Sequence, residues 1–246
     1  GGMMRRQLLL AAGWMLAAAL AGFGCRRAPR PGTVGPVYLA PDFGSNALQR
    51  VERLLALGPR DAGTPGAEKA AQWIAGELRA AGLAPRVDRF VDPAPGGPRP
   101  FYNVLAELPG SEAKTFVLLS HFDTKTGMDP GFTGANDSGS STGLLLELAA
   151  LLAQTTPVRG PGFLFAFLDG EECRVAYGPR DGLHGSRRLA RQLQQRGTPV
   201  EAVILLDMVG DADLTLTLPR NGTPELKLLL LDAANAQGCR DKVKVL

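Results

Sequence analysis

An apolar segment that ends in acidic residues constrains the fold of this chain more than any other feature. Residues 162–168 read Gly-Phe-Leu-Phe-Ala-Phe-Leu, and Asp169, Gly170, Glu171 and Glu172 follow at once. A short, Phe-rich run bounded by glycines predicts a strand that is buried on both faces. Carboxylates at the end of such a strand are typical of the edge where an α/β sheet binds ligands, although an acidic pair is more often a solvated turn. Adjacent side chains of an extended chain point in opposite directions, so one glutamate can hold a metal while the other faces a substrate.

Strand and helix patterns alternate along the rest of the chain. Apolar residues at helical spacing predict helices over residues 45–57, capped by Ser45, and over 67–81, 140–154, 186–195 and 225–236. Strands are expected over residues 86–91, 101–108, 115–120, 163–168, 202–206 and 214–218. We expect 86–91 to be an edge strand, 101–108 to pair with 115–120, and 202–206 to be buried. The alternation predicts an α/β fold with a mixed, largely parallel central sheet flanked by helices.

Polar residues follow three of the predicted strands. They are His121 and Asp123 after 115–120, Glu171 and Glu172 after 163–168, and Asp207 after 202–206, with Asp137 just before a predicted helix. The carboxyl ends of parallel strands share one edge of a sheet, so these side chains can converge. Converging carboxylates repel each other unless a cation lies between them, and imidazole together with carboxylates suits zinc. The sequence therefore predicts a zinc site at this edge.

Several short motifs form a specific pattern. They are Leu118–Asp123, Gly134–Ser138, Asp169–Glu172, Gly185–Arg187 and Leu206–Gly210, with weaker matches at Gly58–Arg60 and Asn103–Ala106. Together they resemble the M28 family of zinc exopeptidases and the glutaminyl cyclases that share its fold. The resemblance covers residues 45–212. It implies a catalytic domain over residues 43–246 with a zinc exopeptidase-like (phosphorylase/hydrolase-like) fold.

The resemblance implies a role for each polar residue. Asp137 and Glu172 would be zinc ligands, and Glu171 would be the general base and acid. In family members with two zinc ions, His121 and Asp207 would hold the second ion and Asp137 would bridge. In the one-zinc cyclases, Asp207 would instead form a hydrogen bond within the site. The peptide bond after Asp137 is often cis in this family.

An inserted segment distinguishes the two branches of the resemblance. Aminopeptidases of the family usually have little between the Glu-Glu pair and the next Gly-Ser, whereas residues 173–181 are inserted here, as in the cyclases. Tyr177 stands about where the cyclases have an aromatic substrate-binding residue, and Asp123-Thr124-Lys125 is also similar to them. The favoured function is therefore zinc-dependent cyclisation of the N-terminal glutamine of peptides or proteins, with Glu171 and Asp207 as catalytic residues and ammonia as the leaving group. The alternative is a zinc aminopeptidase in which the same base activates water.

Residues 1–30 have the pattern of an export leader. Arg5-Arg6 is followed by an apolar stretch over residues 8–22, and small residues lead to Cys25. Residues 22–25 resemble a bacterial lipoprotein box, which makes Cys25 the expected lipidation site; a plain cleaved signal and an uncleaved anchor are the alternatives. A tether rich in Pro and Gly is expected over residues 31–42. The protein is therefore expected outside the cytoplasm, in the periplasm or anchored to a bacterial membrane.

The charge balance excludes one class of partner. The chain carries 27 Lys and Arg against 24 Asp and Glu, a net charge of +3. Residues 1–30 contain five arginines and no acid, so 22 basic side chains face 24 acidic ones in the remainder. The body of the protein is therefore not a basic nucleic-acid binder. The resemblance implies peptide or protein N-termini as partners.

The resemblance also implies residues that this chain lacks. A catalytic zinc has three protein ligands, and the third in the family is a histidine downstream of Leu206–Gly210, whereas no histidine follows His184. The domain is therefore expected to be incomplete at its C-terminal end, with weak zinc binding, an exposed apolar sheet edge and little or no activity. A non-enzymatic surface lipoprotein is the second alternative. We expect His184 and Cys173 to be structural, and a disulfide between Cys173 and Cys239 is allowed but not implied.

Overall fold

The computed structural model describes residues 39–246 except residues 130 and 156. The described residues fall into two compact units, a larger one of residues 49–208 and a smaller one that includes residues 39–48 and 209–246. The expected leader, its Cys25 and most of the tether lie outside the described residues. In the part of the chain that is described, no helix is both long enough and apolar enough to cross a membrane.

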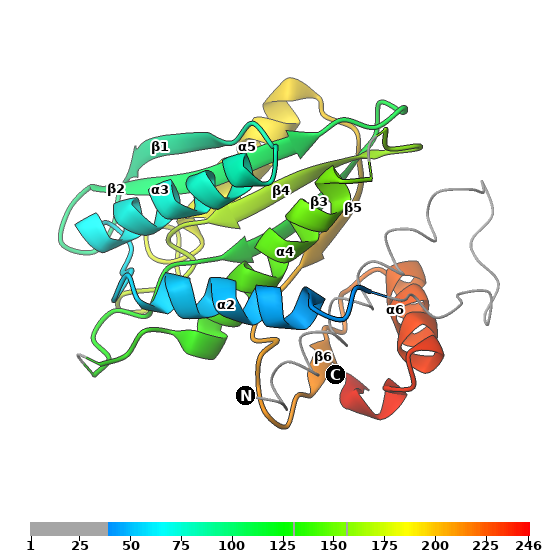
Figure 1. Ribbon diagram of the computed structural model, residues 1–246. Coiled ribbons are helices and arrows are strands. Elements are labelled where there is room, and N and C mark those ends of the chain that lie inside the picture. Colours follow the sequence, from blue (N-terminus) through cyan, green and yellow to red (C-terminus); the bar gives the residue numbers. More distant parts are fainter. Residues whose placement is uncertain (1–38, 130, 156) are drawn as a thin grey trace. The chain divides into compact units, whose positions relative to one another are not determined.

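A five-stranded mixed sheet forms the centre of the larger unit, in the order β1-β2-β4-β3-β5 (Figure 1). Its strands are β1 (Arg86–Asp92), β2 (Arg99–Leu108), β3 (Thr115–His121), β4 (Gly162–Leu168) and β5 (Val200–Leu205). Strands β4, β3 and β5 are parallel, whereas β1 and β2 add antiparallel pairs at one side. The expected α/β fold with a mixed sheet is therefore confirmed, and so is the edge position of β1.

The predicted pairing of residues 101–108 with 115–120 is wrong. Strand β4 lies between β2 and β3, so that Ala166 is opposite Leu105 on one side and Leu119 on the other. All seven residues of β4 are buried. A strand this apolar leaves the least surface in water when it lies in the middle of the sheet, where neighbours cover both its edges and helices cover its faces.

The predicted burial of residues 202–206 is also wrong for most of the strand. Within the described residues β5 pairs only with β3, and Val203 and Leu205 are 53% and 60% exposed. Their shared exposure follows from the alternation of side chains along a strand, because both point to the same face. The exposed apolar sheet edge expected from the sequence is present at β5.

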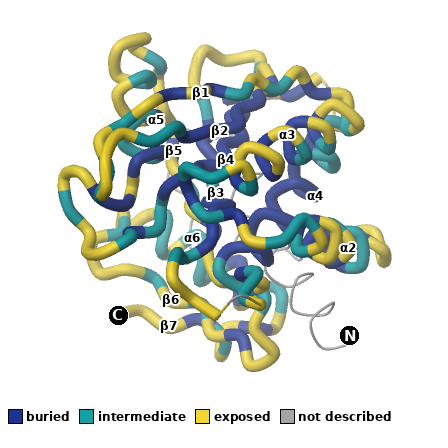
Figure 2. Tube along the Cα trace, turned by 90° about the vertical axis from the view of Figure 1, so that its left-hand side faces the viewer, coloured by how far each residue is buried: buried dark blue, intermediate teal, exposed yellow. Residues whose placement is uncertain are grey.

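Helices cover both faces of the sheet. Helices α3 (Pro65–Ala80) and α4 (Ser141–Ala153) lie in front of it in Figure 1, and α5 (His184–Arg196) lies behind it. Leu189 and Leu193 of α5 pack with Val117 and Leu164 in one apolar cluster. Figure 2 shows buried positions concentrated in the central strands and α4. The core therefore surrounds the three parallel strands.

The helix starts follow local chemistry, with one correction. Thr64 caps α3, and its hydroxyl accepts from the N–H of Ala67. Ser45 does not cap its helix, because α2 (Phe43–Leu55) begins earlier and the Ser45 hydroxyl donates to the carbonyl of Asp42. An ion-pair network connects the helices of the larger unit, since Arg50 contacts Glu77 of α3 and Glu147 of α4.

The described part of the smaller unit contains a two-stranded parallel sheet and a long helix after it. Its elements are β6 (Leu216–Leu218), α6 (Pro224–Ala236), the short helix η2 (Arg240–Lys242) and β7 (Val243–Val245). Ala234, Cys239 and Val243 form its small core. The strand and helix expected here are confirmed, with a shorter strand. Cys173 and Cys239 are both free thiols, so the allowed disulfide is not formed.

Candidate metal centre and active site

The carboxyl ends of the three parallel strands carry the polar residues that the sequence singles out. His121 is the last residue of β3, Glu171 and Glu172 follow β4 after Gly170, and Asp207 follows β5 by two positions. Asp137 lies in the kinked turn η1 (Ala135–Ser140), which leads into α4; the backbone of Asp137 itself is not helical, with φ −105° and ψ 94°. Gly170 has φ +69° and a Cβ there would lie 2.6 Å from the Phe101 ring, so only glycine fits this turn. The expected convergence is confirmed for most of the set.

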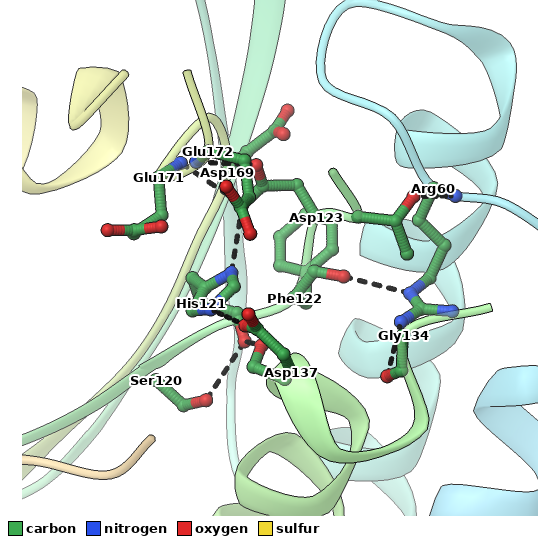
Figure 3. A network of polar contacts seen from close by, with 12 residues as sticks. Arg60, Ser120, His121, Phe122, Asp123, Gly134, Asp137, Asp169, Glu171 and Glu172 are labelled. Atoms are coloured by element: carbon green, nitrogen blue, oxygen red, sulfur yellow. Dashed lines mark hydrogen bonds and ion pairs between the residues drawn. The ribbon is translucent and has the colours of Figure 1, made fainter. Parts of the chain in front are cut away.

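His121, Asp137 and Asp207 form the tightest group. The Nε2 atom of His121 is 3.0 Å from Asp137 Oδ1 and 3.6 Å from Asp207 Oδ1 (Figure 3 draws the first two residues). Potential ligand atoms of all three lie within 4.8 Å of one another. The peptide bond between Asp137 and Ser138 is cis, as the resemblance implies.

The electrostatics of this group centre on the imidazole. Burial alone would lower the pKa of His121, but hydrogen bonds to Asp123, Asp137 and Asp207 outweigh it and raise this pKa to about 12. The hydrogen bond from His121 in turn lowers the pKa of Asp137, against a smaller opposing effect of burial. The contacts of His121 with three carboxylates therefore favour the protonated form of its imidazole.

Asp123 connects the ends of β3 and β4. Its Oδ1 is 3.3 Å from His121 Nδ1 and accepts the backbone N–H of Glu171 at 3.1 Å. Its Oδ2 accepts the N–H of Glu172, also at 3.1 Å. One fully buried carboxylate therefore orients the imidazole and fixes the backbone of both glutamates. Sequence reasoning placed Asp123 in the converging set without this role.

Glu171 is half-buried beside the group. Burial raises its pKa to about 7; the nearby His121 opposes the rise, and neighbouring acids add to it. The hydroxyl of Tyr177 donates to Glu171 Oε2 at 3.4 Å, although the tyrosine itself is 56% exposed. The structure thus brings the expected base and the expected aromatic residue together.

Glu172 does not join the group of His121, Asp137 and Asp207. Its Oε2 atom is 3.2 Å from Lys125 Nζ, which also donates to the carbonyl of Cys173 at 2.7 Å and contacts its sulfur at 3.0 Å. Burial raises the pKa of Glu172, while the hydrogen bond from Lys125 opposes the rise. Cys173 is a buried thiol, as expected, but its contact with Lys125 was missed. The Asp-Thr-Lys sequence after His121 was the only signal for this lysine.

The inserted loop 173–181 is held by one carboxylate. Asp181 accepts the backbone N–H groups of Arg174, Val175 and Ala176 at 2.7 to 3.0 Å. At the end of the loop, a Cβ on Gly182 would lie 2.6 Å from the ring of Tyr177. The ring therefore rests on Gly182, which leaves its hydroxyl beside Glu171.

Two further residues have contacts that the sequence did not specify. Arg60 is fully buried, and burial lowers its pKa to about 10, with Asp123 and Asp61 opposing this effect. His184 is buried too; its Nδ1 is 2.8 Å from Asp92 Oδ2, and its ring stacks on Phe101. His184 is thus structural, as expected. Arg60 was visible only as part of a weak motif.

The residues at the strand ends fit a zinc ion. Zinc prefers imidazole nitrogen and carboxylate oxygen at about 2.0–2.2 Å, and His121, Asp137 and Asp207 offer such atoms around a single point. The Nε2 atom of His121 lies between the carboxylates of Asp137 and Asp207. A divalent cation at this position would supply the positive charge that such a group of acids needs. Asp137 belongs to both expected ligand sets. In the structure Asp137 lies with His121 and Asp207, the residues expected to hold a second zinc ion. Glu172, the other expected ligand, instead pairs with Lys125.

The chain is similar to a defined family over much of its length. A model of peptidase family M28 matches residues 103–241, more than half of the chain. The glutaminyl-peptide cyclotransferase of Drosophila melanogaster is 32% identical over 161 residues, which cover 63% of this chain and 46% of that protein. The chain thus spans about half the length of the curated relatives it matches.

Solved structures agree with the sequence match. A glutaminyl cyclase from an Acidobacteriales bacterium has a TM-score of 0.77 at 32% identity, covering 90% of this chain and 76% of that one. A Zn-dependent exopeptidase from Parabacteroides distasonis has a TM-score of 0.62 at 26% identity, with coverage of 70% and 64%. The expected resemblance to glutaminyl cyclases and the zinc exopeptidase-like fold are confirmed. By fold, motifs and family match, this chain is a member of peptidase family M28.

Proposed function

We propose that this protein is a zinc-dependent glutaminyl cyclase, which converts the N-terminal glutamine of peptides or proteins to pyroglutamate and releases ammonia. The observation that carries the proposal is the contact of Tyr177 with Glu171. An aromatic ring beside the expected base offers an apolar wall for a glutamine side chain, and it lies on the insertion that distinguishes the two branches. The glutaminyl cyclases among the similar proteins support the same choice.

The proposed reaction forms one bond and breaks one. The α-amine of the glutamine attacks its own γ-carbonyl carbon, a five-membered lactam closes, and the γ-amide nitrogen leaves as ammonia. Glu171 accepts a proton from the attacking amine and delivers it to the leaving nitrogen. Asp123 holds the backbone of Glu171 in place for both transfers. Asp207 and His121 supply charge next to this proton path.

Asp137 would hold the metal, together with Glu172 or together with His121 and Asp207. Zinc, when bound, supplies a Lewis acid that polarises the carbonyl oxygen of the substrate. The half-buried setting of Glu171 limits water near the proton that it moves. The protein residues therefore supply the proton transfer and the orientation of the substrate.

One observation favours a second candidate, a zinc aminopeptidase. His121, Asp137 and Asp207 are the residues expected around the second ion of the two-zinc family members, and they form the tightest group. The similar Zn-dependent exopeptidase supports this alternative as well. In such an enzyme Glu171 would take the proton of water instead of an amine.

The reaction product separates the two candidates. We would incubate the zinc-loaded chain with a peptide that begins with glutamine and a peptide that begins with leucine. Ammonia without free amino acid supports the cyclase, and free leucine supports the aminopeptidase. Glu171→Gln is the control, since loss of the base reduces either activity by about 100-fold or more. Absence of both products at saturating zinc would match the little or no activity expected without the histidine that would be the third ligand, and it would support neither enzymatic candidate for these 246 residues.

We further propose that the protein is exported and attached to a bacterial membrane through its leader. The support is the basic, apolar and small-residue pattern of residues 1–30, with Cys25 at the lipoprotein-box position. A labelled fatty acid should be incorporated into the protein in growing bacteria. The Cys25→Ser variant should lose the label and leave the membrane fraction; a variant that keeps the label would contradict lipidation at Cys25.

A further inference from the structure

Arg60 connects three segments of the chain through carbonyl groups. Its Nε donates to the carbonyl of Phe122 at 2.8 Å, its Nη1 to that of Thr133 at 2.9 Å, and its Nη2 to that of Gly134 at 3.4 Å. Figure 3 shows the guanidinium between Phe122 and Gly134. Both ends of the segment between Thr124 and Thr133 are therefore tied to one buried side chain.

The backbone of Arg60 also forms hydrogen bonds with Thr124, at the start of this segment. Its N–H donates to the hydroxyl of Thr124 at 2.9 Å, and its carbonyl accepts the N–H of Thr124 at 3.4 Å. The same hydroxyl donates to Asp61 at 2.6 Å. The turn that carries Arg60 is thus fixed to the segment that follows His121.

The two tied ends lie next to two residues of the metal centre. Phe122 follows His121 directly, and Gly134 precedes Asp137 by three positions. Gly134 has φ +57°, and a Cβ there would lie 2.4 Å from the carbonyl oxygen of Asp137. A displacement of Gly134 is therefore transmitted to Asp137 by direct contact. The carbonyls that Arg60 holds therefore lie beside His121 on one side and beside Asp137 on the other.

A lysine cannot replace this arrangement. The guanidinium presents its donors in a rigid planar fork, whereas an ammonium is a single point at the end of a flexible chain. The three carbonyls accept hydrogen bonds from three different nitrogens of Arg60. Because the side chain is fully buried, water cannot take over a lost donor at low cost.

We infer that Arg60 is a positioning residue of the metal centre, which fixes the separation of His121 and Asp137 by holding the carbonyls next to each of them. The side chain of Arg60 acts through the backbone carbonyls to which it donates. The inference uses the site of the proposed function but does not depend on which reaction occurs there.

Nuclear magnetic resonance of the imidazole nitrogens tests this inference on the metal-free full chain. The sequence contains two histidines, so His184 serves as an internal reference for His121. The test variant is Arg60→Lys. The matched control is Arg50→Lys. Arg50 belongs to the same unit, and its guanidinium contacts Glu77 and Glu147 away from the site.

We expect Arg60→Lys to shift the Nε2 signal of His121 toward that of a free imidazolium and to speed exchange of its proton with water. The His184 signals should stay unchanged, and Arg50→Lys should leave both histidines unchanged. The inference is overturned if the His121 signals of Arg60→Lys match the wild type, or if Arg50→Lys changes them equally.

Zinc affinity, measured by competition with a chelator, gives a second readout. Displacing the partners that orient ligands typically costs about 10- to 100-fold in affinity, and we expect a loss in this range for Arg60→Lys. The Arg50→Lys control should stay within about twofold of the wild type, as expected for a site without shared partners. Equal affinities for the two variants would overturn the inference. A cyclase assay that fails while both readouts hold would contradict the proposed function alone.

Discussion

The carboxylate of Asp123 accepts the backbone N–H of Glu172, so that β3 and β4 end at one shared acid. The same carboxylate accepts the N–H of Glu171. Two motifs that lie far apart in the sequence are thus held in one geometry. The position of both glutamates depends on this acid as much as on their own strand.

The substitution Asp123→Asn tests this relationship. An asparagine retains one acceptor oxygen, and its NH₂ group faces an N–H donor that it cannot satisfy. We expect kcat for the proposed cyclisation to fall by about 10- to 100-fold, with a smaller change in KM, because Glu171 is displaced while the ring of Tyr177 stays in place. Steady-state kinetics with a glutamine peptide measures both. An unchanged kcat would show that the two N–H contacts do not position Glu171.

The Nζ atom of Lys125 is 3.2 Å from the carboxylate of Glu172, so a metal ion bound by Glu172 would compete with this lysine. The substitution Lys125→Met should therefore raise zinc affinity. An ion pair of this partly exposed kind contributes about 0.2–1 kcal/mol, which corresponds to roughly one- to fivefold in affinity. Chelator competition measures the effect.

The control for Lys125 is Lys114→Met. Lys114 also forms an ion pair, with Glu201 at 2.6 Å, but both residues lie away from the strand ends that carry the site. Its loss should leave zinc affinity unchanged. Lower affinity in Lys125→Met would mean that the lysine orients Glu172 for the metal and does not compete with it.

Tyr177 depends on the absence of a side chain at position 182. The substitution Gly182→Ala would place a Cβ 2.6 Å from its ring and would also strain a residue with φ +73°. We expect the ring to move away from Glu171, KM for glutamine peptides to rise several-fold, and stability to fall by about 1 kcal/mol. Gly178→Ala is the matched control, because no atom lies closer than 3.8 Å to the Cβ that alanine would add there. Equal KM values for the two variants would show that Tyr177 does not contribute to substrate binding.

The ion pair of Asp88 predicts how stability depends on pH. Burial would raise the pKa of Asp88, but hydrogen bonds from Arg188 and Gln192 outweigh it, so the pKa is lowered. A lowered carboxyl pKa stabilises the fold above the pKa of the unfolded chain, and this contribution disappears as the pH falls through the folded-state value. Arg188 approaches both Asp88 oxygens, at 3.1 and 3.2 Å.

Arg188→Met should therefore lower the free energy of unfolding at pH 7 by about 1 kcal/mol, since the arginine is partly exposed. It should have little effect at a pH below the carboxyl range, where Asp88 is protonated in both states. Urea denaturation at the two pH values measures the difference. The exposed Arg191 of the same helix provides the control, and an equal loss at both pH values would contradict the ion-pair explanation.

Local patterns in the sequence predicted the parts of this fold that depend on local chemistry. The apolar run of β4, the buried helix α4 and the convergence of His121, Asp137 and Asp207 follow from burial and from the geometry of parallel strands. The order of strands did not follow, because pairing depends on contacts between distant segments. Insertion of β4 between β2 and β3 has no signature in the residues that join them.

The contacts that support the site were harder to predict than its acids. The carbonyl groups that accept from the Arg60 side chain belong to Gly58, Phe122, Thr133 and Gly134. They are backbone atoms, so no residue type marks them. Lys125 reaches Glu172 across a large separation in sequence. A single sequence identifies groups with reactive chemistry, whereas their partners become visible only when the chain is folded.

The residues of the candidate metal centre follow strands that differ in local stability, because β5 is an edge strand within the described residues and β3 is not. His121 ends a strand with neighbours on both sides, whereas Asp207 follows a strand that pairs only with β3 within the described residues. Local opening of β5 would withdraw Asp207 and leave His121 and Asp137 in contact. Amide hydrogen exchange should therefore be faster in β5 than in β3. The centre would then form in two stages. His121 and Asp137 would stay in contact, and Asp207 would join them only while β5 is paired.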